Sequence, residues 1–556
     1  MWLALARFVP LPCPVDMAST DRLDSWKEIA AYLNRSVRTV RRWEAGEDLP
    51  VHRHMHRAQG SVYAFKSEID AWRQATHVSR VESAPSGAAI TITPIAVLPF
   101  TNLSPDAENE YFADGLTDEV IADLSKVRSL RVISRTSSMA LKGTRKDVKA
   151  IGRELRVRFV LEGTVRRAAD RLRISARLID ASSDECLWTG KYDGTVEDIF
   201  AVQERLARTI VHALQLQLTA DEHEQLAVRR IENVHAYECY LQARHEAYRW
   251  RQDAIDHAIQ LLHNGLALIG DNAELYAALG RAHLQYREAG IDLSEGPLRE
   301  AENCARKVLT LEPRLPAGLQ LRGWINYSSG RIQEAVRDLK AAQEIDQNNP
   351  DTLALLCNCY LISGYVSFAR PLIDRLVAVD PLTPLTRCLP GFADFMEGDV
   401  ASALGPYRQM FDMDPGNPMA RLFYVPILAA NGRMSEVREI VSDFPAEAKE
   451  TIPGRLTNFL AHALAGNRSD ALAMLTPQTE TIANATDVFP RFLALGYAAI
   501  GMVDRAIHSL SIAVDRGFIN YPFLAHHDPF MKPLRTDRRF RQLLATVRER
   551  WEKFDP

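Results

Sequence analysis

Basic side chains gather near the N-terminus of this 556-residue chain, in a pattern that could bind phosphates and base edges. Residues 34–66 hold seven Arg or Lys against three acidic residues, whereas the whole chain has a net charge of −4. Arginine, lysine and hydroxyl side chains donate hydrogen bonds to phosphate oxygens and to bases in a DNA groove. The charge distribution therefore confines any nucleic-acid surface to this local stretch.

Short helical patterns position these basic residues. Residues 25–33 predict an amphipathic helix with a capping box between Ser25 and Glu28, and residues 36–46 predict a second helix after a short turn. Residues 51–65 alternate around Gly60 and predict a β-hairpin wing, and residues 67–74 predict a third helix. The apolar positions of the two leading helices are Trp26, Ile29, Ala30 and Leu33 in the first and Val37, Val40 and Trp43 in the second.

The order of helix, turn, basic helix and wing in residues 21–76 resembles the winged helix-turn-helix of MerR-type regulators and phage excisionases. The resemblance implies a DNA-binding domain whose basic helix enters the major groove. A protein-binding winged helix with a solvated charged face is the alternative. Specific binding normally needs two such modules, which favours a homodimer or a partner, although the sequence shows no coiled-coil heptads. The implied DNA-binding residues are Ser36, Arg38, Thr39, Arg41 and Arg42 in the helix and Arg53, Arg57, Tyr63 and Lys66 in the wing.

Other clusters could carry metal chemistry. His52, His54 and His56 alternate on one face of a strand, but histidines also suit a wing beside phosphates, and we favour this second interpretation. A run of acidic residues could also bind a metal, but acidic side chains are favoured at a helix start in any case, and we favour this second interpretation. The acidic residues are Asp106, Glu108, Glu110, Asp114, Asp118, Glu119 and Asp123. Phosphate-loop, dinucleotide, zinc-protease and nucleophile-elbow motifs are absent. We therefore predict no enzyme activity, no cofactor and no metal.

Residues 94–220 alternate strand and helix patterns, which predicts an α/β domain. Residues 95–100 predict a buried strand, and Thr117 is expected to cap a helix over 118–127. The segment IAVLPFTNLSPDAENEYFADGLTDEVIADLS, with VLEGTVRR and WTGKYD, resembles the TolB amino-terminal-like domain, which implies a non-catalytic sensing or interaction role. The later elements are expected as strands at 130–133, 159–165, 172–179 and 187–192 and as helices at 148–155 and 199–218.

Glycines recur every 34 residues in the last part of the chain, at Gly330, Gly364, Gly398, Gly432 and Gly466. A small residue follows five positions after most of them, and prolines end helices in the same phase. Residues 231–556 therefore resemble a tetratricopeptide (TPR) array of about eight units. The resemblance implies an all-α solenoid whose concave face binds a protein or peptide. We expect Cys357 and Cys359 in its core and residues 527–540 as a loop and soluble terminal cap.

The chain is 47% hydrophobic and 25% charged, which is typical of soluble globular proteins. We expect residues 1–20 to be disordered or to include a mis-assigned start, with Met17 as the true one, and residues 77–93 to form a flexible linker. Low cysteine usage favours a cytoplasmic, reduced location. The longest uncharged run, residues 83–105, contains four prolines, which favours a linker over a membrane helix and predicts no membrane attachment. The whole sequence predicts a multidomain protein: a DNA-binding transcription regulator whose α/β domain and TPR solenoid receive a protein or peptide signal. The alternative is a TPR scaffold without sequence-specific DNA binding.

Overall fold

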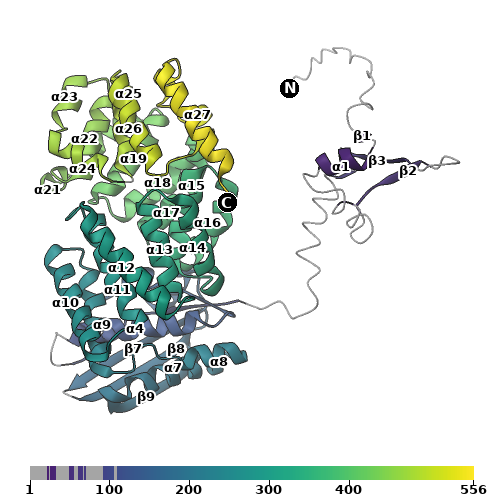
Figure 1. The fold of residues 1–556 in the computed structure, drawn as a ribbon. Helices are drawn as coiled ribbons and strands as arrows, with labels where there is room; N and C mark the ends of the chain where they lie inside the picture. The colour runs from purple at the N-terminus through teal and green to yellow at the C-terminus, as the bar shows by residue number, and fades with distance from the viewer. Residues whose placement is uncertain are drawn as a thin grey trace, which may run out of the picture. The chain divides into compact units, whose positions relative to one another are not determined.

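The computed structural model describes residues 22–23, 25–32, 40, 49–54, 61–66, 68–69, 92–104, 109–168, 170–486 and 488–556. The chain divides into two compact units, Met1–Thr91 and Ile92–Pro556 (Figure 1). Among the described residues, every helix is too short or too polar to cross a membrane. The predicted linker lies almost entirely outside the described residues.

The first unit contains helix α1 (Trp26–Tyr32) and a three-stranded antiparallel sheet in the order β1-β3-β2. The strands are β1 (Arg22–Leu23), β2 (His52–His54) and β3 (Ser61–Phe65). Strands β2 and β3 pair from His52↔Tyr63 to His54↔Ser61, which confirms the predicted hairpin pairing. At the start of α1, the Glu28 N–H donates to Ser25 Oγ over 3.2 Å, as the capping pattern predicts. The predicted basic helix lies outside the described residues apart from the buried Val40.

A mixed sheet forms the α/β part of the second unit, in the order β6-β4-β7-β8-β9 with the short β5 beside β7. Strand β4 runs parallel to both β6 and β7, whereas β7, β8 and β9 are antiparallel. This arrangement agrees with the predicted α/β class. The strands are β4 (Thr93–Val97), β5 (Thr101–Asn102), β6 (Leu130–Val132), β7 (Phe159–Ala168), β8 (Arg171–Asp180) and β9 (Glu185–Thr195).

Two hydrophobic layers cover this sheet because successive side chains of a strand point to opposite faces. Ile95 and Val97 join the core with α4 and α7, whereas Ala96 belongs to a second core that contains residues of α6 and the flanking residues Ile133 and Leu141. The helices are α4 (Glu110–Ser125), α5 (Arg135–Met139), α6 (Val148–Leu155), α7 (Ile199–Ala213) and α8 (Ala220–Ala227). The sequence patterns predicted α6 with its observed bounds and missed α5.

The predicted start of the first α/β helix was wrong. Helix α4 begins at Glu110, so Thr117 lies in its interior and not at its N-cap. The buried Thr117 hydroxyl donates to the Ala113 carbonyl over 2.9 Å and accepts the Phe100 N–H over 2.9 Å. A cap-forming residue can serve inside a helix when its hydroxyl bonds back to the preceding turn. Here it also ties the helix to the segment that follows β4.

A helical array follows, in which consecutive antiparallel pairs run from the α/β domain toward the C-terminus (Figure 1). Six of the turns contain the periodic glycines Gly330, Gly364, Gly398, Gly432, Gly466 and Gly501, which all adopt positive φ between 72° and 88°. This confirms the predicted role of the 34-residue glycine period, since such a turn disfavours other residues. The pairs are α9 (Val234–Ala247) with α10 (Gln252–Ile269), α11 (Ala273–Glu288) with α12 (Glu295–Leu311), α13 (Pro316–Ser328) with α14 (Ile332–Ile345), α15 (Pro350–Ser363) with α16 (Val366–Val379), α17 (Pro384–Met396) with α18 (Val400–Met413), α19 (Pro418–Ala430) with α20 (Met434–Ser442), α22 (Ile452–Leu464) with α23 (Arg468–Ala473), and α25 (Phe489–Ala499) with α26 (Val503–Asp515).

The C-terminal segment packs back onto the array. The buried Asn520 donates to the Leu361 carbonyl over 2.8 Å, and the Ile519 N–H donates to the Ile362 carbonyl over 3.1 Å. The segment continues through the π-helix η4 (Phe523–His527) and the 3₁₀ turn η5 (Lys532–Leu534) to α27 (Arg538–Lys553). Its apolar residues share one core with α15 and α17, whereas its charged residues Lys532, Arg538 and Arg539 are exposed.

Candidate functional site

Aromatic side chains of β2 and β3 contact one another on the three-stranded sheet. The rings of His52 and Tyr63 stack with centroids 5.1 Å apart, and Tyr63 meets Phe65 edge-on at 5.7 Å. The Lys66 ammonium lies 5.9 Å from the centre of the Tyr32 ring. Two of the predicted DNA-binding residues are therefore described and half-buried: Tyr63 lies in strand β3 and Lys66 directly follows it.

The structure leaves most of the predicted DNA contacts untested. Arg53 lies in strand β2, between two of the three alternating histidines, and His52 Nε2 is 2.6 Å from Glu68 Oε2. This contact occupies one ring nitrogen of His52. The remaining predicted contacts, which lie outside the described residues, are Ser36, Arg38, Thr39, Arg41, Arg42 and Arg57.

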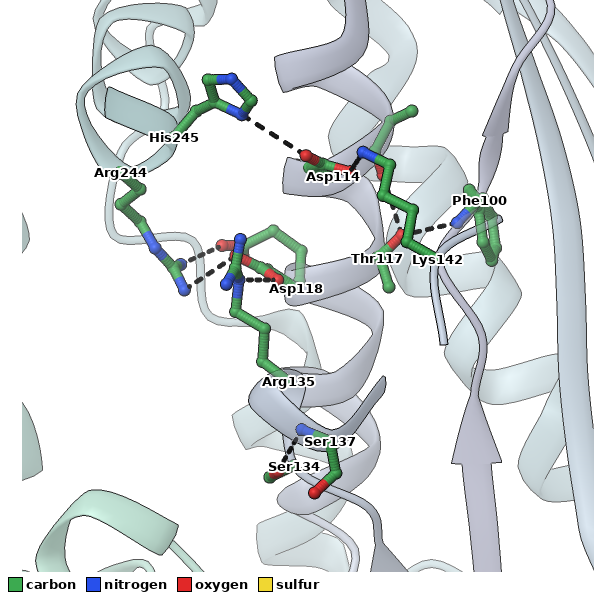
Figure 2. A network of polar contacts seen from close by, with 12 residues as sticks. Phe100, Asp114, Thr117, Asp118, Ser134, Arg135, Ser137, Lys142, Arg244 and His245 are labelled. Atoms are coloured by element: carbon green, nitrogen blue, oxygen red, sulfur yellow. Dashed lines mark hydrogen bonds and ion pairs between the residues drawn. The ribbon is translucent and has the colours of Figure 1, made fainter. Parts of the chain in front are cut away.

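A polar network joins the α/β domain to the first helix of the array, and Figure 2 shows it from close by. Asp118 of α4 contacts Arg135 of α5 over 2.5 Å and Arg244 of α9 over 3.2 Å. The Arg135 guanidinium also lies 3.5 Å from the centre of the Tyr248 ring. Because Asp118 is only 5% exposed, this carboxylate needs both cations to offset its lost hydration.

The second carboxylate of this network is Asp114, one turn earlier on α4. It contacts Lys142 over 2.5 Å and His245 of α9 over 3.4 Å. Burial opposes its charge, but hydrogen bonds and attraction from His245 and Lys142 lower the pKa of Asp114 below its ordinary value. The carboxylate is thus held ionised between two elements that meet at this junction.

The described members of the acidic set, from Glu110 to Asp123, therefore pair with cations of this chain. Among all the residues that the structure describes, no group of three or more histidine, cysteine or acidic side chains could hold a metal ion. Asp106 and Glu108 lie outside the described residues. The partners Arg135, Lys142 and Arg244 had no sequence signal, because they come from three segments that only the fold brings together.

Glu119 lies next to Asp118 on α4, and its position raises the pKa of its carboxyl group. Burial, reinforced by repulsion from Asp123, Glu274 and Asp118, raises the pKa of Glu119 to about 7 against the attraction of Arg244. The folded chain therefore binds this proton more tightly than the unfolded chain. Stability is then lost as the pH rises from the ordinary glutamate value toward 7.

We predict that Glu119→Gln is more stable than the wild type at pH 8, by about 1–3 kcal/mol, and nearly equal to it at pH 5. The reason is that glutamine keeps the shape of the protonated carboxyl at every pH. Thermal and urea unfolding at both pH values measure the difference. Glu344→Gln, at an exposed position on α14, is the control. An equal effect of Glu119→Gln at both pH values would contradict the prediction.

A second contact connects the α/β domain to a pair much further along the chain. Asp380, at the end of α16, accepts hydrogen bonds from the hydroxyls of Ser134, Ser137 at 2.7 Å and Thr386 at 2.9 Å. The Ser134 N–H also donates to the Val379 carbonyl over 2.7 Å. All four side chains are buried. The α/β domain is therefore bound at α9 and again at the α16–α17 turn.

Comparison with known proteins finds a similarity to a regulator family in this region. Residues 91–227 match the family described as HilA/YgeH-like transcriptional regulator, second domain. The match covers the sheet and the helices α4 to α8. The chain therefore combines a regulator-like α/β domain with a helical repeat array. The helix-turn-helix and TolB-like resemblances stay predictions.

A curated relative corrects the expectation that the chain is not an enzyme. "Putative adenylate cyclase 3" of Rhizobium meliloti (strain 1021) is 46% identical over 185 residues. The aligned part is 33% of this chain and 32% of the relative, so the chain spans about a third of the relative's length. The absence of common catalytic motifs was therefore not a sound basis for excluding an enzyme.

Solved structures show weaker likenesses. A tetratricopeptide repeat protein from Parabacteroides merdae ATCC 43184 is 14% identical, covering 47% of this chain and 99% of its own, with a TM-score of 0.35. TolB from Acinetobacter baumannii is 19% identical, covering 22% of this chain and 28% of its own, with a TM-score of 0.18. Both scores are low, and the repeat assignment rests on this chain's own helix pairs and glycine period.

Proposed function

We propose that the protein is a DNA-binding transcription regulator that recognises DNA through its N-terminal basic module. The match of residues 91–227 to the second domain of HilA/YgeH-like transcriptional regulators carries this proposal. The basic stretch precedes that domain, and the predicted contact Tyr63 lies in its described antiparallel hairpin. The predicted basic helix would read base edges through Arg38, Thr39, Arg41 and Arg42, and Ser36 and the wing residues Arg53 and Arg57 would hold the DNA backbone.

The signal would be received by residues 92–556 acting as one body. Two buried polar contacts, at Asp118 and at Asp380, bind the α/β domain to the array. A protein or peptide that binds the helices would therefore act on the α/β domain as well. Because one small module makes few contacts, we also propose that two copies bind together on a two-fold site.

The test is selection of genomic DNA fragments by the full chain at near-physiological salt. We predict enrichment of a shared inverted motif, and its loss in an Arg38→Ala/Arg42→Ala variant, because these side chains face the groove in the proposed mode. The variant Arg314→Ala/Arg337→Ala removes the same charge from exposed positions of the array and should keep the motif.

Two outcomes would refute this mode of binding. The first is weak binding without a motif that disappears between about 50 and 200 mM salt, which is the behaviour of non-specific charge attraction. The second is equal loss of the motif in both double variants. Either result would favour the scaffold alternative, in which the array holds a protein and the N-terminal module has no preferred site.

A second candidate function is adenylate cyclase activity, favoured by the 46% identity to the relative of that name. The full chain would be incubated with ATP and either Mg²⁺ or Mn²⁺, and the cyclic nucleotide would be measured. Formation above a heat-denatured control would support this candidate. If the ATP concentration did not change, this candidate would fail, and the region shared with the relative would keep only the proposed regulator role.

A further inference from the structure

Three arginines line a small hollow where the end of the array contacts its second and third helix pairs. The hollow is about 330 Å³ in volume, and its lining comes from α12, from the turn between α13 and α14, and from the residue after α26. These segments lie far apart in the chain. The lining residues are Glu295, Leu298, Arg299, Glu302, Ser329, Arg331 and Arg516.

The close approach that builds this hollow occurs at Gly330. A Cβ atom on Gly330 would lie 2.6 Å from the Asp515 carbonyl oxygen and 3.1 Å from Arg516 Cα. The absence of a side chain therefore lets the end of α26 rest on the α13–α14 turn. That contact brings Arg516 to the same hollow as Arg299 of α12.

Two of the three guanidinium groups are not used by the fold. Among the described residues, the guanidinium groups of Arg299 and Arg516 make no hydrogen bond or ion pair. Arg331, in contrast, is 3.3 Å from Glu302 Oε1 and donates to Asn326 Oδ1 over 2.9 Å. The hollow is thus lined by two arginines, Arg299 and Arg516, whose guanidinium groups have no partner among the described residues, and by Arg331, which pairs with Glu302.

We propose that this hollow binds a small phosphate-bearing anion between Arg299 and Arg516. Guanidinium groups bind phosphate oxygens through paired hydrogen bonds, which suits a ligand with several charged oxygens. The lining contains no aromatic side chain on which a base could stack, so the phosphate part is the recognised part. Such a ligand would also fasten α12 to the end of α26. The proposal does not depend on DNA binding.

The experiment uses the full chain and inorganic pyrophosphate, at constant ionic strength, with calorimetry and thermal unfolding as measurements. We expect saturable binding and a midpoint temperature that rises with pyrophosphate concentration. Arg299→Ala/Arg516→Ala should weaken binding at least about tenfold, because it removes charge-assisted hydrogen bonds. Arg337→Ala, an exposed arginine on α14, should bind like the wild type.

A further variant is expected to strengthen pyrophosphate binding, and a misfolded protein would not produce such a gain. Glu302→Gln removes the acid that braces Arg331 and should strengthen pyrophosphate binding about threefold or more. The proposal is overturned by an absence of saturable binding, by equal affinity in the double variant, or by equal losses in that variant and Arg337→Ala. Tighter binding of ATP than of pyrophosphate would overturn the assignment to phosphate alone.

Discussion

Asp380→Ala is expected to lower the free energy of unfolding by about 3 kcal/mol or more and to loosen the α/β domain from the helical array. The carboxylate is only 5% exposed and accepts hydrogen bonds from Ser134, Ser137 and Thr386. Alanine would leave these three buried hydroxyls without their acceptor. Urea unfolding measures the loss of stability, and hydrogen exchange in α5 measures the loosening.

Two variants separate the interdomain contact from a general effect of mutation. Asp374→Ala lies on the exposed side of the same helix, α16, and should change stability by less than about 0.5 kcal/mol. Asp380→Asn keeps one acceptor oxygen and should fall between the wild type and alanine. If exchange in α5 stayed slow in Asp380→Ala, Asp380 would not be what holds the domain in place.

This contact changes how a signal could travel. The sequence suggested separate domains joined in series, but the α/β domain lies against α9 through Arg244 and against the α16–α17 turn through Asp380. Helix pairs between those two contacts are bridged by the α/β domain. A ligand that altered the curvature of the array would therefore strain both contacts at once.

Local rules explain which parts of the fold could be predicted. A turn with positive φ needs glycine, so its 34-residue period showed where each pair of helices turns. Capping at Ser25 and hairpin pairing at His52 depend on a few neighbouring residues and were also predictable. Alternating polar and apolar residues showed the strand β8 in the same way.

The parts that could not be predicted depend on long-range contacts. Thr117 has the pattern of an N-cap, yet Phe100 supplies a backbone donor that holds it inside α4. Asp380 has an ordinary position after a helix, and only the fold brings Ser134 beside it. The candidate anion site has the same character, since Arg299 and Arg516 line one hollow only because the end of α26 lies against the α13–α14 turn.

Gly330→Ala is expected to destabilise the protein by about 3 kcal/mol, and Gly501→Ala by about 1 kcal/mol. Both glycines belong to the same repeat position and have nearly equal backbone angles, with φ of 74° and 73°. Alanine costs the same backbone strain in either turn. The difference is that a Cβ at Gly501 meets nothing within 4 Å, whereas at Gly330 it would lie 2.6 Å from the Asp515 carbonyl oxygen.

Comparison of the two variants therefore isolates the packing of the chain end against the α13–α14 turn, because their shared strain cancels. Urea unfolding gives the two free energies, and Gly466→Ala, also open around its Cβ, should agree with Gly501→Ala. The Gly330 variant should also bind pyrophosphate more weakly, since Arg516 must move with Asp515. Equal losses of stability at Gly330 and Gly501 would mean that the end of α26 can shift at no cost, and the hollow beside it would then have no fixed shape.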